Sequence, residues 1–163
     1  MIFGVNNKAG SSTAASTLAI SKSSEVKGRV LVVDDIAENR EILSYYLTKA
    51  GYQVVTADDG FAAVEGLVGG AAMRRGVLPQ QGFDLVLMDM SMPRVSGYEA
   101  VPRLRASGYR TPIVAVTAHS LAGDREKCLN AGCDEYVTKP VDPKRLVEVC
   151  DRMMEMGRLR KSA

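Results

Sequence analysis

The sequence has few of the features that mark secreted, metal-stapled or membrane-spanning proteins. Its three cysteines, Cys128, Cys133 and Cys150, are odd in number and show no C-x-x-C spacing, which argues against a disulfide framework and a structural zinc site. No stretch approaches the roughly 18 apolar residues of a membrane span, and the Ser- and Thr-rich start lacks the apolar segment of a signal peptide. We therefore expect a cytoplasmic protein in a reducing compartment.

The sequence also lacks an excess of either charge. Its 21 Lys and Arg residues nearly balance 19 Asp and Glu residues, and only two basic clusters occur, at residues 74–75 and 158–161. A net charge of +2 is too small to predict binding to nucleic acid, so we interpret both clusters as solvated surface. With 163 residues, of which 46% are apolar and 25% charged, the chain can form one domain with a single core.

Strands and helices alternate along the chain after a polar first segment. Residues 1–27 are rich in Ser, Ala, Thr, Asn and Gly and predict a flexible arm or linker. Apolar runs predict five strands, at residues 29–33, 52–57, 83–88, 111–116 and 134–138. Because parallel crossovers are right-handed and need helices on both faces, the pattern predicts an α/β fold with a doubly wound, five-stranded parallel sheet.

Five helices are predicted between and after these strands. The first carries an apolar stripe that stops at Gly51, a residue typical of the position after a helix; the stripe is Ile42, Leu43, Tyr46, Leu47 and Ala50. The others are expected at residues 61–68, 97–106, 121–131 and 143 to about 156. The glycines and prolines of residues 66–82 predict an extended surface loop after the second helix.

Four of the strands end in polar residues that would meet at one edge of the sheet. The first strand is followed by Asp34 and Asp35, the third by Asp89, the fourth by Thr117 and the fifth by Lys139. In open parallel sheets, ligand sites lie at the carboxyl ends of the strands. Three carboxylates, a hydroxyl and an ammonium group in one place suit a divalent cation and a phosphoryl group.

With these strand ends aligned, the chain resembles the receiver domain of two-component response regulators, particularly the receivers attached to hybrid histidine kinases. The resemblance covers residues 28 to about 156 as a receiver domain and leaves residues 157–163 as a short basic tail. It implies a flavodoxin-like sheet with strand order 2-1-3-4-5. The matching motifs are Val32-Val33-Asp34-Asp35, Leu87-Met88-Asp89-Met90-Ser91-Met92-Pro93 with Ser96-Gly97, Ala115-Val116-Thr117-Ala118 and Tyr136-Val137-Thr138-Lys139-Pro140.

The resemblance implies that Asp89 is the phosphoacceptor, whose carboxylate attacks a phosphohistidine and becomes an acyl phosphate. An aspartate is already ionised at neutral pH, so it needs no base. Clustered carboxylates repel one another and the incoming phosphoryl group, so a hard cation is required. The implied ion is Mg²⁺, with Mn²⁺ as an alternative, bound directly by Asp35 and Asp89, through water by Asp34, and by the backbone carbonyl of Ser91.

The resemblance also implies roles for residues of the last two strands. Lys139 would pair with a phosphoryl oxygen from the side opposite the metal, and its bond to Pro140 is expected to be cis. Thr117 would hydrogen-bond the phosphoryl group, and Tyr136 would turn inward as Thr117 moves. This movement would reshape the surface formed by the last two helices and the last strand. The remaining residues expected to border the site are Ala118, His119 and Pro140.

The implied phosphodonor is a histidine kinase or a histidine phosphotransfer protein, and the implied reader of the signal is a downstream protein target. We expect no direct contact of this chain with nucleic acid or membrane, although a membrane-bound hybrid kinase would tether it. We also expect a phosphoacceptor that assists its own phosphorylation and dephosphorylation, and not an enzyme in the ordinary sense. The oligomeric state is left open.

Two other functions are compatible with parts of the pattern. A phosphohydrolase with an aspartyl-phosphate intermediate, of the haloacid-dehalogenase kind, would need a second acid two residues after Asp89, where this chain has Ser91. A degenerate receiver would only bind partners, and the complete set of acids, hydroxyl and lysine argues against it. Each residue alone has a simpler explanation, such as a helix cap for Asp34 or packing for Tyr136. The prediction depends on the combination.

Overall fold

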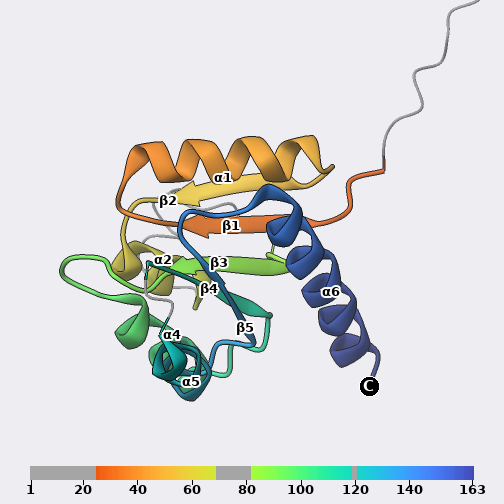
Figure 1. The fold of residues 1–163 in the computed structure, drawn as a ribbon. Helices are drawn as coiled ribbons and strands as arrows, with labels where there is room; N and C mark the ends of the chain where they lie inside the picture. Colours follow the sequence, from red (N-terminus) through yellow and green to blue (C-terminus); the bar gives the residue numbers. More distant parts are fainter. Residues whose placement is uncertain (1–24, 69–81, 119–120) are drawn as a thin grey trace, which may run out of the picture.

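One parallel sheet forms the centre of the molecule in the computed structural model, which describes residues 25–68, 82–118 and 121–163 (Figure 1). Its strand order is β2-β1-β3-β4-β5, which confirms the doubly wound fold. Most of the predicted arm and most of the predicted loop at residues 66–82 lie outside the described residues. The strands are β1 (Arg29–Val33), β2 (Gln53–Ala57), β3 (Leu85–Asp89), β4 (Ile113–Thr117) and β5 (Glu135–Thr138).

Helices cover both faces of the sheet, as Figure 1 shows. One face carries α1 (Ala37–Lys49) and α6 (Pro143–Ser162); the other carries α2 (Gly60–Leu67), α4 (Gly97–Ala106) and α5 (Ala122–Ala131). Successive residues of a strand point to opposite faces, so each strand contributes to two cores. In β1, Val30 and Val32 pack with the α1 and α6 side chains, whereas Leu31 and Val33 pack with those of α2, α4 and α5.

The first helix buries only part of its apolar stripe. Gly51 follows the helix with a φ of 95°, as expected for a residue after a helix end. Leu43 and Leu47 are buried against the sheet, but Ile42 is 50% exposed. The Ile42 side chain lines a cavity beside the segment that follows β5.

The last helix does not end near Met156 as predicted but continues to Ser162. Arg160 pairs with Asp134 at 2.9 Å and Lys161 pairs with Asp84 at 3.0 Å. These acids precede β5 and β3, so the basic run is ion-paired to the amino ends of the strands. Gly157 permits the close approach, since a Cβ there would lie 3.0 Å from Cγ of Pro112. No helix within the described ranges is long and apolar enough to cross a bilayer.

Candidate functional site

Three carboxylates meet at the carboxyl edge of the sheet. Asp34 and Asp35 follow β1, and Asp89 ends β3, the strand that pairs with β1 in parallel register. One carboxylate oxygen from each residue lies within 4.8 Å of the other two. Asp34 is 1% exposed and Asp89 is 3% exposed, whereas Asp35 is partly buried. This cluster, the acidic cluster, therefore concentrates negative charge at a largely buried place.

Lys139 brings a positive charge to the acidic cluster from the end of β5, the edge strand that lies two strands away from β3. It follows β5, yet its Nζ lies 2.9 Å from Oδ2 of Asp34 and 3.4 Å from Oδ1 of Asp89. Its backbone N–H donates to the carbonyl of Thr117 at 2.8 Å, which ties the segment to the end of β4. The Lys139–Pro140 bond is cis, as the resemblance implies.

Burial and pairing have opposite effects on the charges of this site. Burial raises the pKa of Asp89 above its usual range, although the Ser91 N–H, at 3.1 Å from Oδ1, and the Lys139 ammonium oppose the shift. Burial also works to lower the pKa of Lys139, but the Asp34 and Asp89 carboxylates outweigh it and the pKa is raised. Lys139 therefore stays protonated, and one ammonium faces three carboxyl groups.

The donor set of the acidic cluster fits a hard divalent cation. Oδ1 of Asp35 is buried and accepts no hydrogen bond from the part of the chain that the structure describes. A buried carboxylate oxygen without a partner is costly, and a cation that prefers oxygen ligands satisfies it. Together with the short separation of the three carboxylates, this makes a Mg²⁺-sized ion compatible with the residues present.

The remaining predicted residues differ in burial. Thr117 is fully buried at the end of β4, and Ala118 follows it at an exposed position. Tyr136 is partly buried and packs with the core under α2, α4 and α5, with Ala115 as its partner in β4. Pro140 is exposed beside Lys139, and His119 lies outside the described residues.

Two residues of α1 hold Asp34 in place and are missed by the sequence analysis. The Asn39 side-chain amide donates to both carboxylate oxygens of Asp34, at 3.2 and 3.1 Å, and Arg40 donates to its carbonyl at 2.6 Å. The helix begins directly after the acidic residues, so polar residues in its first turn are close to the strand end. An Asn one turn into a helix that starts at a strand end is the signal that could have identified Asn39.

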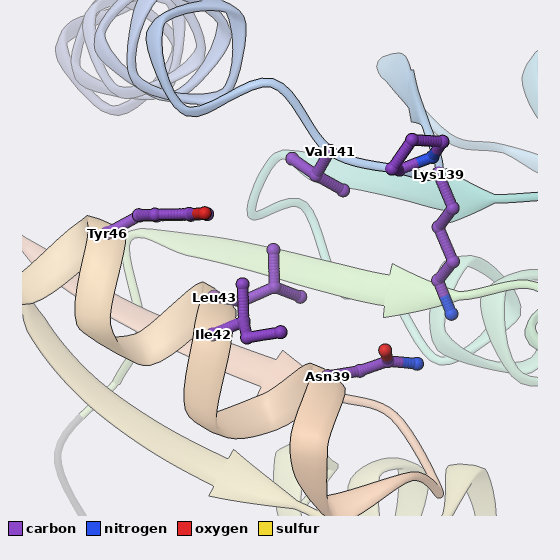
Figure 2. Close-up of a pocket in the computed structure, with 7 residues that line it drawn as sticks. Asn39, Ile42, Leu43, Tyr46, Lys139 and Val141 are labelled. Atoms are coloured by element: carbon purple, nitrogen blue, oxygen red, sulfur yellow. The ribbon is translucent and has the colours of Figure 1, made fainter.

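A cavity of about 220 Å³ lies next to Lys139, between α1 and the segment after β5 (Figure 2). Asn39 and the Lys139 side chain lie at its polar end, next to the acidic cluster. Its remaining lining is mainly apolar, and Ile42 is half exposed there. The cavity therefore offers an apolar contact surface beside the charged site; its lining residues are Asn39, Ile42, Leu43, Tyr46, Lys139, Pro140 and Val141.

The strand order and the acidic cluster with its lysine define a receiver-type α/β protein. Residues 30–151 match the family model described as the response regulator receiver domain. The chain belongs to this family, whose members are the phosphoacceptor domains of two-component signalling.

Relatives among characterised proteins are hybrid and sensor kinases. The chain is 37% identical over 149 residues to hybrid signal transduction histidine kinase I of Dictyostelium discoideum. The matched region makes up 89% of this chain and 8% of the kinase. It is 39% identical over 112 residues to the sensor histidine kinase RcsC of Salmonella typhimurium. Here the matched region makes up 69% of this chain and 11% of the kinase. The chain thus spans about a tenth of the length of these relatives.

A solved structure has the same fold at comparable identity. The receiver domain of sensor histidine kinase PA1611 from Pseudomonas aeruginosa is 34% identical, with a TM-score of 0.66 over 78% of this chain and 98% of that domain. That structure has a magnesium ion coordinated in its active-site cleft.

Proposed function

We propose that this chain is the phosphoacceptor of a phosphorelay, in which Asp89 takes a phosphoryl group from a phosphohistidine. The observation that carries the proposal is the position of Asp89, whose buried carboxylate lies within 4.8 Å of the Asp34 and Asp35 carboxylates and 3.4 Å from the Lys139 ammonium. A nucleophile in such surroundings needs charge neutralisation, and the same groups supply it.

The proposed cation site combines the acidic cluster with the backbone carbonyl of Ser91. Asp35 and Asp89 would bind Mg²⁺ directly, Asp34 would bind it through water, and the Ser91 carbonyl would complete the protein ligands; Mn²⁺ is the alternative ion. When bound, the ion neutralises the carboxylates and the phosphoryl oxygens. Two observations support this assignment: the magnesium ion in the related PA1611 receiver, and the buried Asp35 oxygen, which has no hydrogen-bond partner among the described residues.

In the transfer step, a carboxylate oxygen of Asp89 forms a bond to phosphorus while the bond between phosphorus and the donor's imidazole nitrogen breaks. The electron pair of the broken bond stays on that nitrogen, and a proton on the other ring nitrogen lets the donor leave as neutral imidazole. No general base is required, because Asp89 attacks as a carboxylate. Lys139 pairs with a phosphoryl oxygen, and Thr117 donates a hydrogen bond to another. Tyr136 turns inward as Thr117 moves, and the surface of α5, β5 and α6 changes for a downstream protein. The domain is consumed as an acceptor and is not a catalyst with turnover.

Labelling by a small phosphodonor tests the proposal. Wild-type protein is incubated with acetyl phosphate and Mg²⁺, and its intact mass is followed with time. We expect the gain of one phosphoryl group, and no gain when EDTA replaces Mg²⁺. Rapid multiple turnover of phosphate esters would instead indicate a phosphohydrolase, and absence of labelling would indicate a degenerate receiver; either result overturns the proposal.

The cavity between α1 and the segment after β5 is the proposed contact surface for the phosphodonor. An approaching phosphohistidine must come within bonding distance of Asp89, and the half-exposed Ile42 lies in the apolar surface nearest to Lys139. The relatives are histidine kinases, so the donor is a histidine kinase or a histidine phosphotransfer protein. As part of a hybrid kinase, the domain would work on the cytoplasmic side of the membrane that tethers the kinase.

Replacing Ile42 with Glu should slow phosphoryl transfer from a protein donor but not from a small-molecule donor. A charge in an apolar contact is expected to slow transfer from a phosphorylated histidine phosphotransfer domain by about ten-fold or more, while labelling by acetyl phosphate stays unchanged. Both rates are measured by intact mass, with a phosphotransfer domain that labels the wild type. The matched control is Leu159→Glu, since Leu159 is 63% exposed on α6 and does not line the cavity. Equal transfer rates for wild type and Ile42→Glu would exclude this surface.

A further inference from the structure

The loop between β3 and α4, residues 90–96, carries Ser91 and lies beside the amino end of α2. The Ser91 N–H donates to Asp89, so the backbone position of Ser91 affects the acceptor carboxylate directly. The loop is fixed at its two ends: Met90 donates to the Val116 carbonyl at 3.0 Å, and the Ser96 N–H donates to Glu99 at 3.0 Å in the first turn of α4. Between the ends, Met92 is buried in the core, and Arg94 and Val95 contact the start of α2.

The first of these contacts is an ion pair between Asp59 and Arg94. Asp59 is the N-cap of α2, and its Oδ1 accepts hydrogen bonds from the N–H groups of Phe61 and Ala62. Its Oδ2 accepts from the Arg94 guanidinium. The Asp59 side chain is 11% exposed, whereas that of Arg94 is 77% exposed. The Asp59 carboxylate is thus held in place by α2, and the exposed Arg94 side chain of the loop binds to it.

The backbone of Arg94 indicates that this position is imposed by its surroundings. Its φ is 66°, and it is the one residue other than glycine with a positive φ in the described part of the chain. A side chain in this conformation is strained and persists only where neighbouring contacts determine it. The pair with Asp59 is such a contact.

The second contact is a close approach of backbone to backbone. A Cβ on Gly60 would lie 2.5 Å from the Val95 carbonyl oxygen and 3.1 Å from Cε of Met92. The glycine therefore allows the loop to lie directly on the first turn of α2, with no room for a methyl group. Asp59 and Gly60 are adjacent, so the start of α2 determines where the loop lies.

We propose that Asp59 and Arg94 are positioning residues that set the cation affinity of the acidic cluster through the loop that carries Ser91. The inference rests on the proposed function, which makes the Ser91 carbonyl a cation ligand. An exposed ion pair contributes little to the free energy of unfolding, so the pair's effect is expected in the geometry of the site and not in stability.

Calorimetric titration with Mg²⁺ tests this inference in the absence of any phosphodonor. Asp59→Asn retains the helix cap, because an Asn oxygen accepts the same backbone hydrogen bonds, but it removes the charge that Arg94 meets. We expect Asp59→Asn and Arg94→Gln each to weaken Mg²⁺ binding by about three-fold. The double variant should be no weaker than either single variant, because the two residues act as a pair. Thermal midpoints should stay close to that of the wild type.

Two further variants complete the test. Gly60→Ala moves the loop without altering any charge, and we expect a larger loss of Mg²⁺ affinity than for either charge variant. Glu135→Gln breaks another partly exposed pair, with Arg152, far from the loop, and should leave Mg²⁺ binding unchanged. Wild-type affinity in Asp59→Asn, Arg94→Gln and Gly60→Ala would overturn the inference. If these variants weaken Mg²⁺ binding but acetyl phosphate does not label the wild type, the phosphoacceptor role fails, while the effect of the loop on cation affinity stands.

Discussion

Asp89→Asn should abolish labelling by acetyl phosphate, with a loss of at least about a thousand-fold. The amide is nearly the same size as the carboxylate, and its oxygen can still accept the Ser91 N–H, so the site keeps its shape. It has no anionic oxygen that could attack phosphorus. Intact mass after incubation with Mg²⁺ and acetyl phosphate measures the loss, and a variant labelled at the wild-type rate would end the assignment of Asp89 as the acceptor.

The same variant should raise the thermal midpoint of the protein in Mg²⁺-free buffer. Three carboxylates within 4.8 Å repel one another in a place with little water, and removing one relieves part of this repulsion. Saturating Mg²⁺ should reduce the difference, because the ion stabilises the wild type more than the variant. A suitable control is Asp142→Asn, since Asp142 is an exposed N-cap of α6 and Asn retains the cap. Equal midpoints for Asp89→Asn and wild type would show that the charges do not repel significantly.

Lys139→Ala should slow labelling by about a hundred-fold without weakening Mg²⁺ binding. Removing one group that stabilises the charge of a transition state typically has an effect of this size. The ammonium lies 2.9 Å from Asp34 and 3.4 Å from Asp89, so it competes with the cation for the same carboxylates. We therefore expect Mg²⁺ to bind the variant as tightly as the wild type, or more tightly. Labelling rates and calorimetric titration measure the two effects separately.

The matched control is Lys144→Ala, which removes an exposed lysine from the first turn of α6. It should leave both the labelling rate and the Mg²⁺ affinity unchanged. A large loss of Mg²⁺ affinity in Lys139→Ala would mean that the lysine supports the acidic cluster structurally, and the role proposed for it in transfer would have to be abandoned.

The fold is predictable because its signals are local. Each buried strand is a short apolar run, and the alternation with helices leaves few topologies. Features that depend on residues far apart in the sequence are not predictable in this way. Ile42 belongs to the apolar stripe of α1 by its spacing, but the width of the buried face depends on how α1 and the segment after β5 approach each other. The end of α6 depends on Asp84 and Asp134, which lie far from Arg160 and Lys161 in the sequence.

The same distinction applies to the candidate site. Asp34, Asp35, Asp89 and Lys139 are predictable as neighbours, because the carboxyl ends of parallel strands share one edge of a sheet. Asn39 could have been found from its place in the first turn of α1. The pair of Asp59 and Arg94 could not, because the lengths of two separate loops determine whether these side chains meet.

The hydrogen bonds of Asp34 make the start of α1 part of the acidic cluster. Ile36, the N-cap residue, makes no side-chain cap of its own; instead its N–H donates to Asp34 at 2.9 Å. Asn39 and Arg40 attach the following turn to the same aspartate. Amide hydrogen exchange in the first turn of α1 should therefore slow when a cation occupies the site, even though no residue of that helix ligates it.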